Sequence, residues 1–85
     1  MQTTLLQYQV LIKREEKNYI SYVPTLGISD FGKTIEETQK NTENAIICHI
    51  EGLIKTNTDV PAPDSGDVYL SQTNITLPYP IRFAI

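Results

Sequence analysis

A chain of 85 residues with 40% hydrophobic and 20% charged residues is long enough for one small folded domain and too apolar for a disordered one. Its acidic residues outnumber its basic ones, giving a net charge of −3, which disfavours direct nucleic-acid binding and favours a basic protein partner. One cysteine, Cys48, excludes an intramolecular disulfide and a cysteine-cluster zinc site. Because no signal-peptide pattern and no apolar run of bilayer-spanning length is present, we expect a soluble, cytoplasmic protein without membrane contact.

The first part of the sequence predicts three strands. Within 5–13, apolar residues alternate with others in the period of a strand with one buried face. A charged stretch, 14–18, separates this run from 19–23, which is rich in β-forming residues, so the two predict a hairpin with a polar tip. Pro24 should end the second strand, and 28–31 predicts a short third one.

A long helix is predicted from residue 35 to about residue 55. The hydroxyl of Thr34 and the carboxylate of Glu37 have the spacing of a capping box at its start. Its predicted buried stripe consists of Ile35, Thr38, Thr42, Ala45, Ile46, His49, Ile50 and Leu53.

The residues after the helix predict extended chain. The proline pair in 61–63 enforces an extended path, and 64–67 reads as a loop. Both 75–77 and 81–85 are apolar enough for strands, and two prolines lie between them. The sequence therefore leaves open whether this segment forms one strand or two.

The predicted order is therefore β-β-β-α-β. We expect an α+β domain in which one helix packs on one face of a mostly antiparallel sheet. A single domain should span residues 1–85, with a core of about 5–63 and a loop and C-terminal strand or strands over 64–85.

Several short motifs, spread over roughly residues 6–63, resemble the N-terminal domain of HicB-type antitoxins. The motifs are Tyr19-x-Ser21-x-Val23-Pro24-x-Leu26, Gly32-x-Thr34-Ile35-Glu36-Glu37, Ile50-Glu51-Gly52-Leu53 and Pro61-x-Pro63. The resemblance implies a partial RNase H-like fold and binding of a small mRNA-cleaving toxin of the HicA type. Many HicB proteins also carry a C-terminal DNA-binding domain, but 64–85 does not have the helical pattern of one, so promoter binding is not expected from this segment.

The RNase H likeness raises the question of nuclease activity. That chemistry needs several carboxylates around divalent metals, with an acid inside the first strand, and 5–13 contains none. The only histidine, His49, lies in the predicted stripe, and Cys48 points about 100° away from it, so a nucleophilic pair is geometrically poor. We therefore predict no enzyme activity, no metal site and no cofactor.

The leading hypothesis is an antitoxin-like module that covers the active surface of a HicA-like toxin. The alternative is a non-enzymatic oligomeric scaffold or regulatory module of HicB-like fold with no toxin partner. Acidic and aromatic residues at the hairpin tip and before the helix suit a basic partner, although Tyr22 and Phe31 suit the core equally well. The predicted partner-binding residues are Glu15, Glu16, Tyr19, Tyr22, Leu26, Asp30 and Phe31.

We also expect a homodimer or a higher even-numbered oligomer. Ile47 and Ile54 share a flank of the helix outside the stripe, which either the C-terminal segment or another chain should cover. An apolar terminal strand containing Ile81 and Phe83 should likewise pair within the domain or across a dimer.

Overall fold

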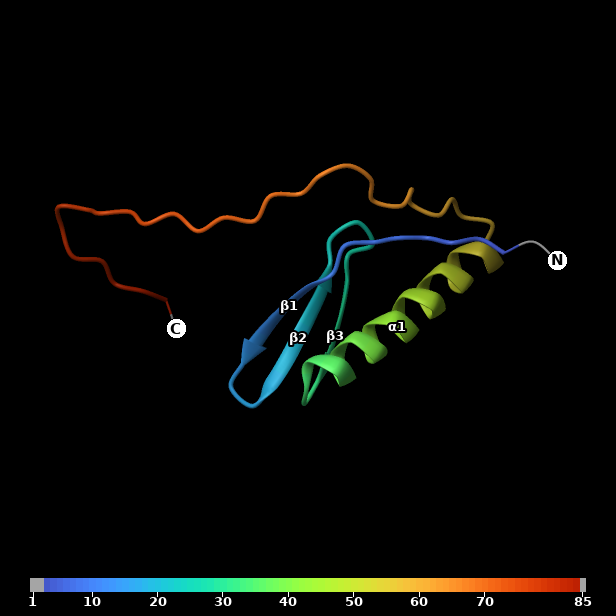
Figure 1. Cartoon of the computed structure of the whole chain (residues 1–85), viewed down its shortest axis with the longest axis horizontal. Coiled ribbons are helices and arrows are strands. Elements are labelled where there is room, and N and C mark those ends of the chain that lie inside the picture. Colours follow the sequence, from blue (N-terminus) through green and yellow to red (C-terminus); the bar gives the residue numbers. More distant parts are fainter. Residues whose placement is uncertain (1–2, 85) are drawn as a thin grey trace.

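Three strands form one antiparallel sheet, and one long helix covers one of its faces (Figure 1). The computed structural model describes residues 3–84. Its elements are β1 (Leu11–Glu15), β2 (Asn18–Val23), β3 (Ile28–Gly32) and α1 (Ile35–Lys55), and the strand order is β1-β2-β3. The predicted α+β class, the antiparallel sheet and the single packed helix are confirmed.

Two short turns connect the strands. The β1–β2 hairpin has Glu15 opposite Asn18, and Glu16 in the turn adopts a φ of 53°, in the left-handed region that two-residue hairpins require. In the β2–β3 connection, Gly27 has a φ of 67°, and its N–H donates to the carbonyl of Val23 at 2.8 Å. Glycine suits this position because it has no Cβ to oppose a positive φ.

The first strand begins at Leu11, so the prediction of a strand from residue 5 is wrong for its first half. Leu11 pairs with Tyr22, close to the end of β2. Beyond that point the neighbouring chain continues into Pro24, which has no N–H to donate, so residues 3–10 have no strand of the sheet beside them. They continue as an extended segment alongside the helix (Figure 1).

The helix begins as the sequence predicts, with the Thr34 hydroxyl accepting a hydrogen bond from the Glu37 N–H at 3.0 Å. Its predicted stripe faces the sheet: two threonines are buried, and the other members except Ile35 are half-buried. Ile35 is exposed because it lies in the first turn, past the end of β3. Gly32 lets this turn approach closely, since a Cβ there would lie 2.8 Å from the backbone nitrogen of Thr38.

Hydroxyl groups occupy the centre of the interface between sheet and helix. Ser21 Oγ on β2 lies 2.6 Å from Thr42 Oγ1 on α1, and both residues are almost completely buried. The Thr42 hydroxyl also lies 2.6 Å from the carbonyl of Thr38, and the Asp30 N–H donates to Ser21 Oγ at 3.1 Å. Since each hydroxyl has one proton and Thr42 donates to Thr38, Ser21 is the donor in the shorter contact with Thr42, and the carbonyl of Asp30 lies 3.2 Å from the same Ser21 hydroxyl as a second acceptor.

A second set of hydrogen bonds fastens the N-terminal segment to the chain that follows the helix. The Asp64 N–H donates to the carbonyl of Gln7, and the Asp64 carboxylate accepts from the Gln9 N–H at 2.8 Å and from the Thr25 hydroxyl at 2.6 Å. The Tyr8 hydroxyl donates to the carbonyl of Pro61. Hydrogen bonds from Gln9 and then Thr25 hold the pKa of Asp64 below its ordinary value of 3.8, because they stabilise the ionised carboxylate.

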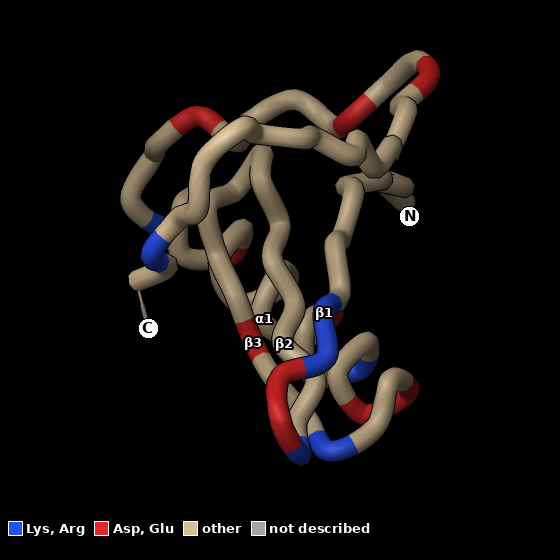
Figure 2. Tube along the Cα trace, turned by 90° about the vertical axis from the view of Figure 1, so that its left-hand side faces the viewer, with Lys and Arg blue, Asp and Glu red and all other residues tan. Residues whose placement is uncertain are grey.

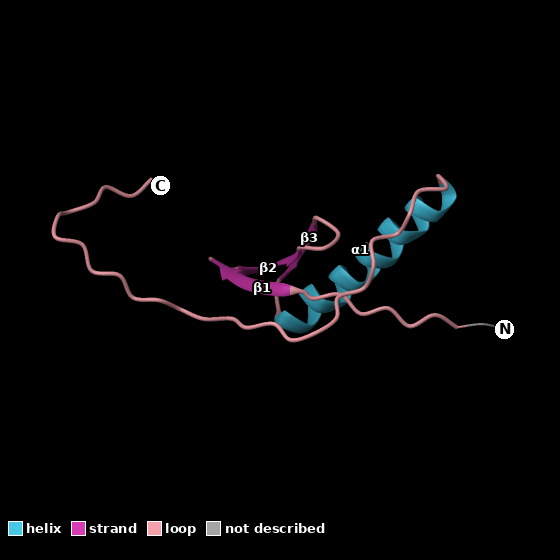
Figure 3. Cartoon of the chain, turned by 90° about the horizontal axis from the view of Figure 1, so that it is seen from above, coloured by secondary structure: helices cyan, strands magenta, loops and turns pink. Residues whose placement is uncertain are grey.

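The predicted C-terminal strand is not formed within residues 56–84, so the last element of β-β-β-α-β and the strand or strands placed in 64–85 are corrected. From residue 65 the chain runs away from the sheet and helix as an extended tail that bends at Pro78 and Tyr79 (Figures 1 and 3). It raises the radius of gyration to 17.1 Å, against about 12 Å for a compact chain of this length. A strand needs a neighbour, and the tail has none in the single chain.

The buried hydroxyl pair gives a first prediction. Ser21→Ala removes the hydrogen bond that the buried Thr42 hydroxyl accepts from Ser21. This substitution should lower the free energy of unfolding by about 1–2 kcal/mol, measured by urea denaturation. The matched control is Ser29→Ala, an exposed serine on the neighbouring strand, which should change it by less than about 0.5 kcal/mol. Equal effects of the two substitutions would contradict the role given to Ser21.

The Asp64 anchor predicts a pH dependence. Because its folded pKa is lowered, ionised Asp64 stabilises the fold above its ordinary value of 3.8, and this contribution disappears as the pH falls through the folded pKa. The melting temperature of the protein should therefore exceed that of Asp64→Asn at neutral pH, and the difference should vanish in acid. The control is Asp67→Asn, three residues beyond Asp64 in the chain, which should have the same melting temperature as the unmodified protein at both pH values. A difference independent of pH would refute the electrostatic origin.

Candidate partner-binding surface

The two faces of the sheet have different surroundings. Ser21 meets the helix, so the alternation along β2 places Tyr19 and Val23 on the same, covered side. Ile20 and Tyr22 consequently point to the other side, which neither the helix nor the N-terminal segment covers (Figure 3). We call this side the open face.

Cross-strand pairing gathers apolar residues on the open face. Ile20 lies opposite Phe31 of β3, and Tyr22 lies opposite Leu11 of β1. Residues directly opposite in an antiparallel pair share a face, so these four side chains form one patch that crosses all three strands. Tyr22 is 46% exposed and Phe31 63% exposed, so the patch is accessible in the single chain.

The backbone around Phe31 is fixed from two directions. The amide side chain of Asn41 on α1 donates to the Phe31 carbonyl at 2.8 Å. The Phe31 N–H donates to the carboxylate of Asp30, also at 2.8 Å. These bonds hold the start of the aromatic side chain in place although the ring itself is exposed, which reduces the entropy that binding would cost.

Charges of both signs surround the hairpin tip. Glu15 and Glu16 lie there, but Lys13, Arg14 and Lys17 adjoin them (Figure 2). The tip is therefore not the acidic surface that its two glutamates suggest. The remaining acids are spread over β3, the helix and the loops, so the net charge of −3 belongs to the chain as a whole.

The structure brings together only some of the predicted partner-binding residues. Glu15, Tyr22 and Phe31 lie on the open face, with Glu16 in the adjoining turn. Leu26, by contrast, is only 9% exposed and belongs to the core, so it is corrected as a surface contact. It is buried because the β2–β3 turn folds back on itself, with the Leu26 N–H bonded to the Val23 carbonyl.

Tyr19 and Asp30 lie on the side of the sheet that faces the helix, and both are half-buried. Leu11 and Ile20, which the prediction omitted, take their places on the open face. The parity of the residue numbers along β2 places Ile20 with Tyr22, and the register of a two-residue hairpin places Leu11 opposite Tyr22.

The predicted oligomer residues are all exposed in the single chain. Ile47 and Ile54 lie on one flank of α1, and Ile81 and Phe83 lie on the tail. Cys48 is exposed and His49 half-buried, as their helical positions predict. Among residues 3–84, no three His, Cys, Asp or Glu side chains gather in a way that could hold a metal ion. The helix described within these residues does not have the length and apolar character needed to cross a membrane.

Comparison with known proteins gives one family and one relative. The family model of HicB-like antitoxins of bacterial toxin–antitoxin systems matches residues 8–80. An uncharacterized 14.9 kDa protein from the rep–hol intergenic region of Haemophilus phage HP1 (strain HP1c1) is 29% identical over 66 residues, which cover 76% of this chain. That match covers 50% of the phage protein, so the chain spans half the length of this relative. No solved structure matches the chain significantly.

The placement of Phe31 and Leu26 can be tested without a partner. Phe31→Thr, which keeps a β-forming residue on an exposed strand position, should change the free energy of unfolding by less than about 0.5 kcal/mol. Leu26→Ala should lower it by about 2 kcal/mol or more, because it opens a cavity in the core. The reverse ranking in urea denaturation would show that Phe31 is a core residue and that the open face is misassigned.

Proposed function

The chain belongs to the HicB-like antitoxin family, and from this premise we propose that it neutralises a small HicA-type mRNA-cleaving toxin by covering the toxin's active surface. Antitoxins of this family are not enzymes, so the prediction of no enzyme activity is confirmed by membership. The observation that carries the proposal is the open face, an exposed apolar and aromatic patch that crosses the three paired strands.

The composition of the open face suits a protein partner. Tyr and Phe are enriched at the centres of protein interfaces, and a few such anchors supply most of the binding energy. Ile20 lies two residues from Tyr22 on β2 and directly opposite Phe31 on β3, so one partner surface can contact all three. Glu15 and the adjoining Glu16 form part of the polar rim of this surface.

Electrostatics support the same proposal at longer range. A toxin that cleaves mRNA must bind phosphates and is therefore expected to be basic. The net charge of −3 attracts such a partner and speeds encounter, although the mixed charges of the hairpin tip do not direct the partner to that point. Since the proposed toxin acts on mRNA, the proposal also places the chain in the cytoplasm.

The experiment starts with a search for a small basic protein encoded beside the chain, and with co-expression of the two. The unmodified chain should co-purify with this protein and suppress its cleavage of mRNA. Tyr22→Thr combined with Phe31→Thr should weaken the complex by about 2 kcal/mol or more, roughly 30-fold in dissociation constant, as expected for buried aromatic anchors.

The matched control is Ile54→Thr, because Ile54 and Phe31 are each 63% exposed but lie on different surfaces. This variant should bind the toxin normally. If it loses affinity while the double variant keeps it, the helix flank is the docking surface. If no basic partner co-purifies from the native host, the chain acts instead as a scaffold or regulatory module.

A further inference from the structure

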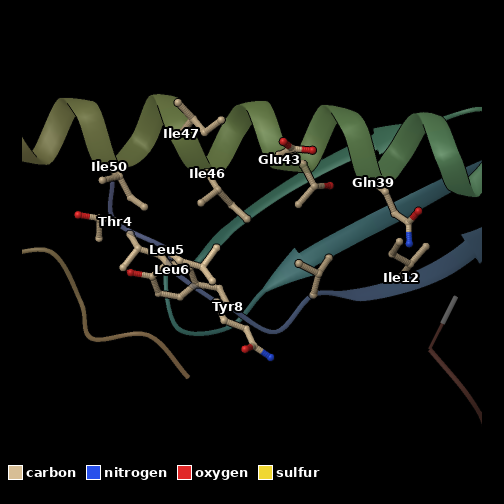
Figure 4. Close-up of a pocket in the computed structure, with 13 residues that line it drawn as sticks. Thr4, Leu5, Leu6, Tyr8, Ile12, Gln39, Glu43, Ile46, Ile47 and Ile50 are labelled. Atoms are coloured by element: carbon tan, nitrogen blue, oxygen red, sulfur yellow. The ribbon is translucent and has the colours of Figure 1, made fainter. Parts of the chain in front are cut away.

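An apolar groove lies between α1 and the N-terminal segment, on the side of the sheet opposite to the open face. Its volume is about 700 Å³ (Figure 4). Three helix residues, Ile46, Ile47 and Ile50, line one wall, and Leu5, Leu6 and Val10 line the other. Glu43 is the one charged residue among those that line it. The groove is therefore mostly aliphatic, with polar side chains such as Gln7 and Gln39 among its lining and one negative charge.

The tail carries the complementary features. Its described end, residues 75–84, is extended and exposes five large apolar side chains: Ile75, Leu77, Tyr79, Ile81 and Phe83. Within residues 68–84, Arg82 is the one charged residue. Exposed apolar side chains at this density are unfavourable in water and mark a surface that is covered on binding.

We propose that the tail of one chain docks in the groove of a second copy, and that the second chain returns its own tail to the first. In this arrangement Ile81 and Phe83 contact the isoleucine wall of the groove, and Arg82 points to the opposite side of the extended tail, toward solvent. The aliphatic contacts supply the affinity.

The N-terminal segment and the tail both contain residues that favour strands but are not paired in a sheet. The run 5–10 was predicted to be part of a strand, and so were 75–77 and 81–85 in the tail, yet the sheet pairs none of their described residues in the single chain. An extended tail beside an extended N-terminal segment provides each with the neighbour that it lacks, which is the way peptides add to an exposed strand.

The path of the tail favours a second copy over the chain's own groove. The chain is anchored at Asp64 by its bonds to Gln7, Gln9 and Thr25, and beyond this point it leads away from α1 and from the N-terminal segment in both views (Figures 1 and 3). Docking in its own groove requires the tail to reverse its direction somewhere within residues 65–80. Two exchanged tails, residues 65–84 from each chain, together with the groove residues reach the size of a standard interface, about 20–30 residues a side.

Cysteine crosslinking in the full chain tests the proposal. In a Cys48→Ser background, Glu43→Cys combined with Ile81→Cys, which keeps Phe83 as the apolar anchor, should give a disulfide-linked dimer on a non-reducing gel. The matched control replaces Glu43→Cys by Glu51→Cys, which lies on the polar face of the same helix and should give no specific crosslink. A crosslinked monomer would show that the tail docks in its own chain, and no crosslink would show that it does not enter the groove. Either result overturns the proposal.

Sedimentation equilibrium gives an independent readout without new cysteines. The unmodified chain should be a dimer at micromolar concentration, and Phe83→Asp should raise the dissociation constant about 30-fold or more, as should Ile47→Asp in the groove. Ile54→Asp is the control on the same flank of α1, because Ile54 does not line the groove and should leave the dimer intact. A chain that stays monomeric at high micromolar concentration contradicts the exchange. Toxin neutralisation on the open face would survive that result, because the two surfaces lie on opposite sides of the sheet.

Discussion

At the centre of the molecule, the hydroxyl of Ser21 meets the hydroxyl of Thr42 at 2.6 Å, with both side chains almost fully removed from solvent. This contact fixes which side of the sheet faces the helix. Because side chains alternate along a strand, the same contact sends Ile20 and Tyr22 to the other side. The open face and the groove beside α1 both depend on this orientation. A slip of β2 by one residue would exchange the two sides of the sheet.

A core built around hydroxyls leaves little apolar surface to bury inside one chain. Val23 and Leu26 are the large apolar residues buried in the part of the chain that the structure describes, whereas many others remain exposed on the open face, the groove and the tail. These exposed apolar residues are available for the two contacts proposed above. The two proposed contacts use different parts of it, so a homodimer can present two open faces to toxin molecules at the same time.

Local rules predicted much of this fold. The capping box located the start of α1, and the spacing of its stripe identified Thr38 and Thr42 as buried positions. Strand propensity located the three paired strands but extended the first to residue 5, because propensity does not show where the neighbouring strand ends. The C-terminal strand was wrongly predicted for the same reason, because strand propensity does not show whether a neighbouring strand is present. Tyr22 and Leu26 were both placed on the partner surface, yet only the path of the β2–β3 turn shows that Leu26 folds inward.

The extended tail also bears on the lifetime of the protein in the cell. Proteases engage exposed segments that lack secondary structure, and residues 65–84 offer such a segment without any prior unfolding of the sheet or helix. A chain whose tail is covered by a partner withholds this entry point, whereas an unassembled chain presents it continuously. Degradation would then remove unassembled copies selectively, and the amount of the protein would follow the amount of its assemblies rather than the rate of its synthesis.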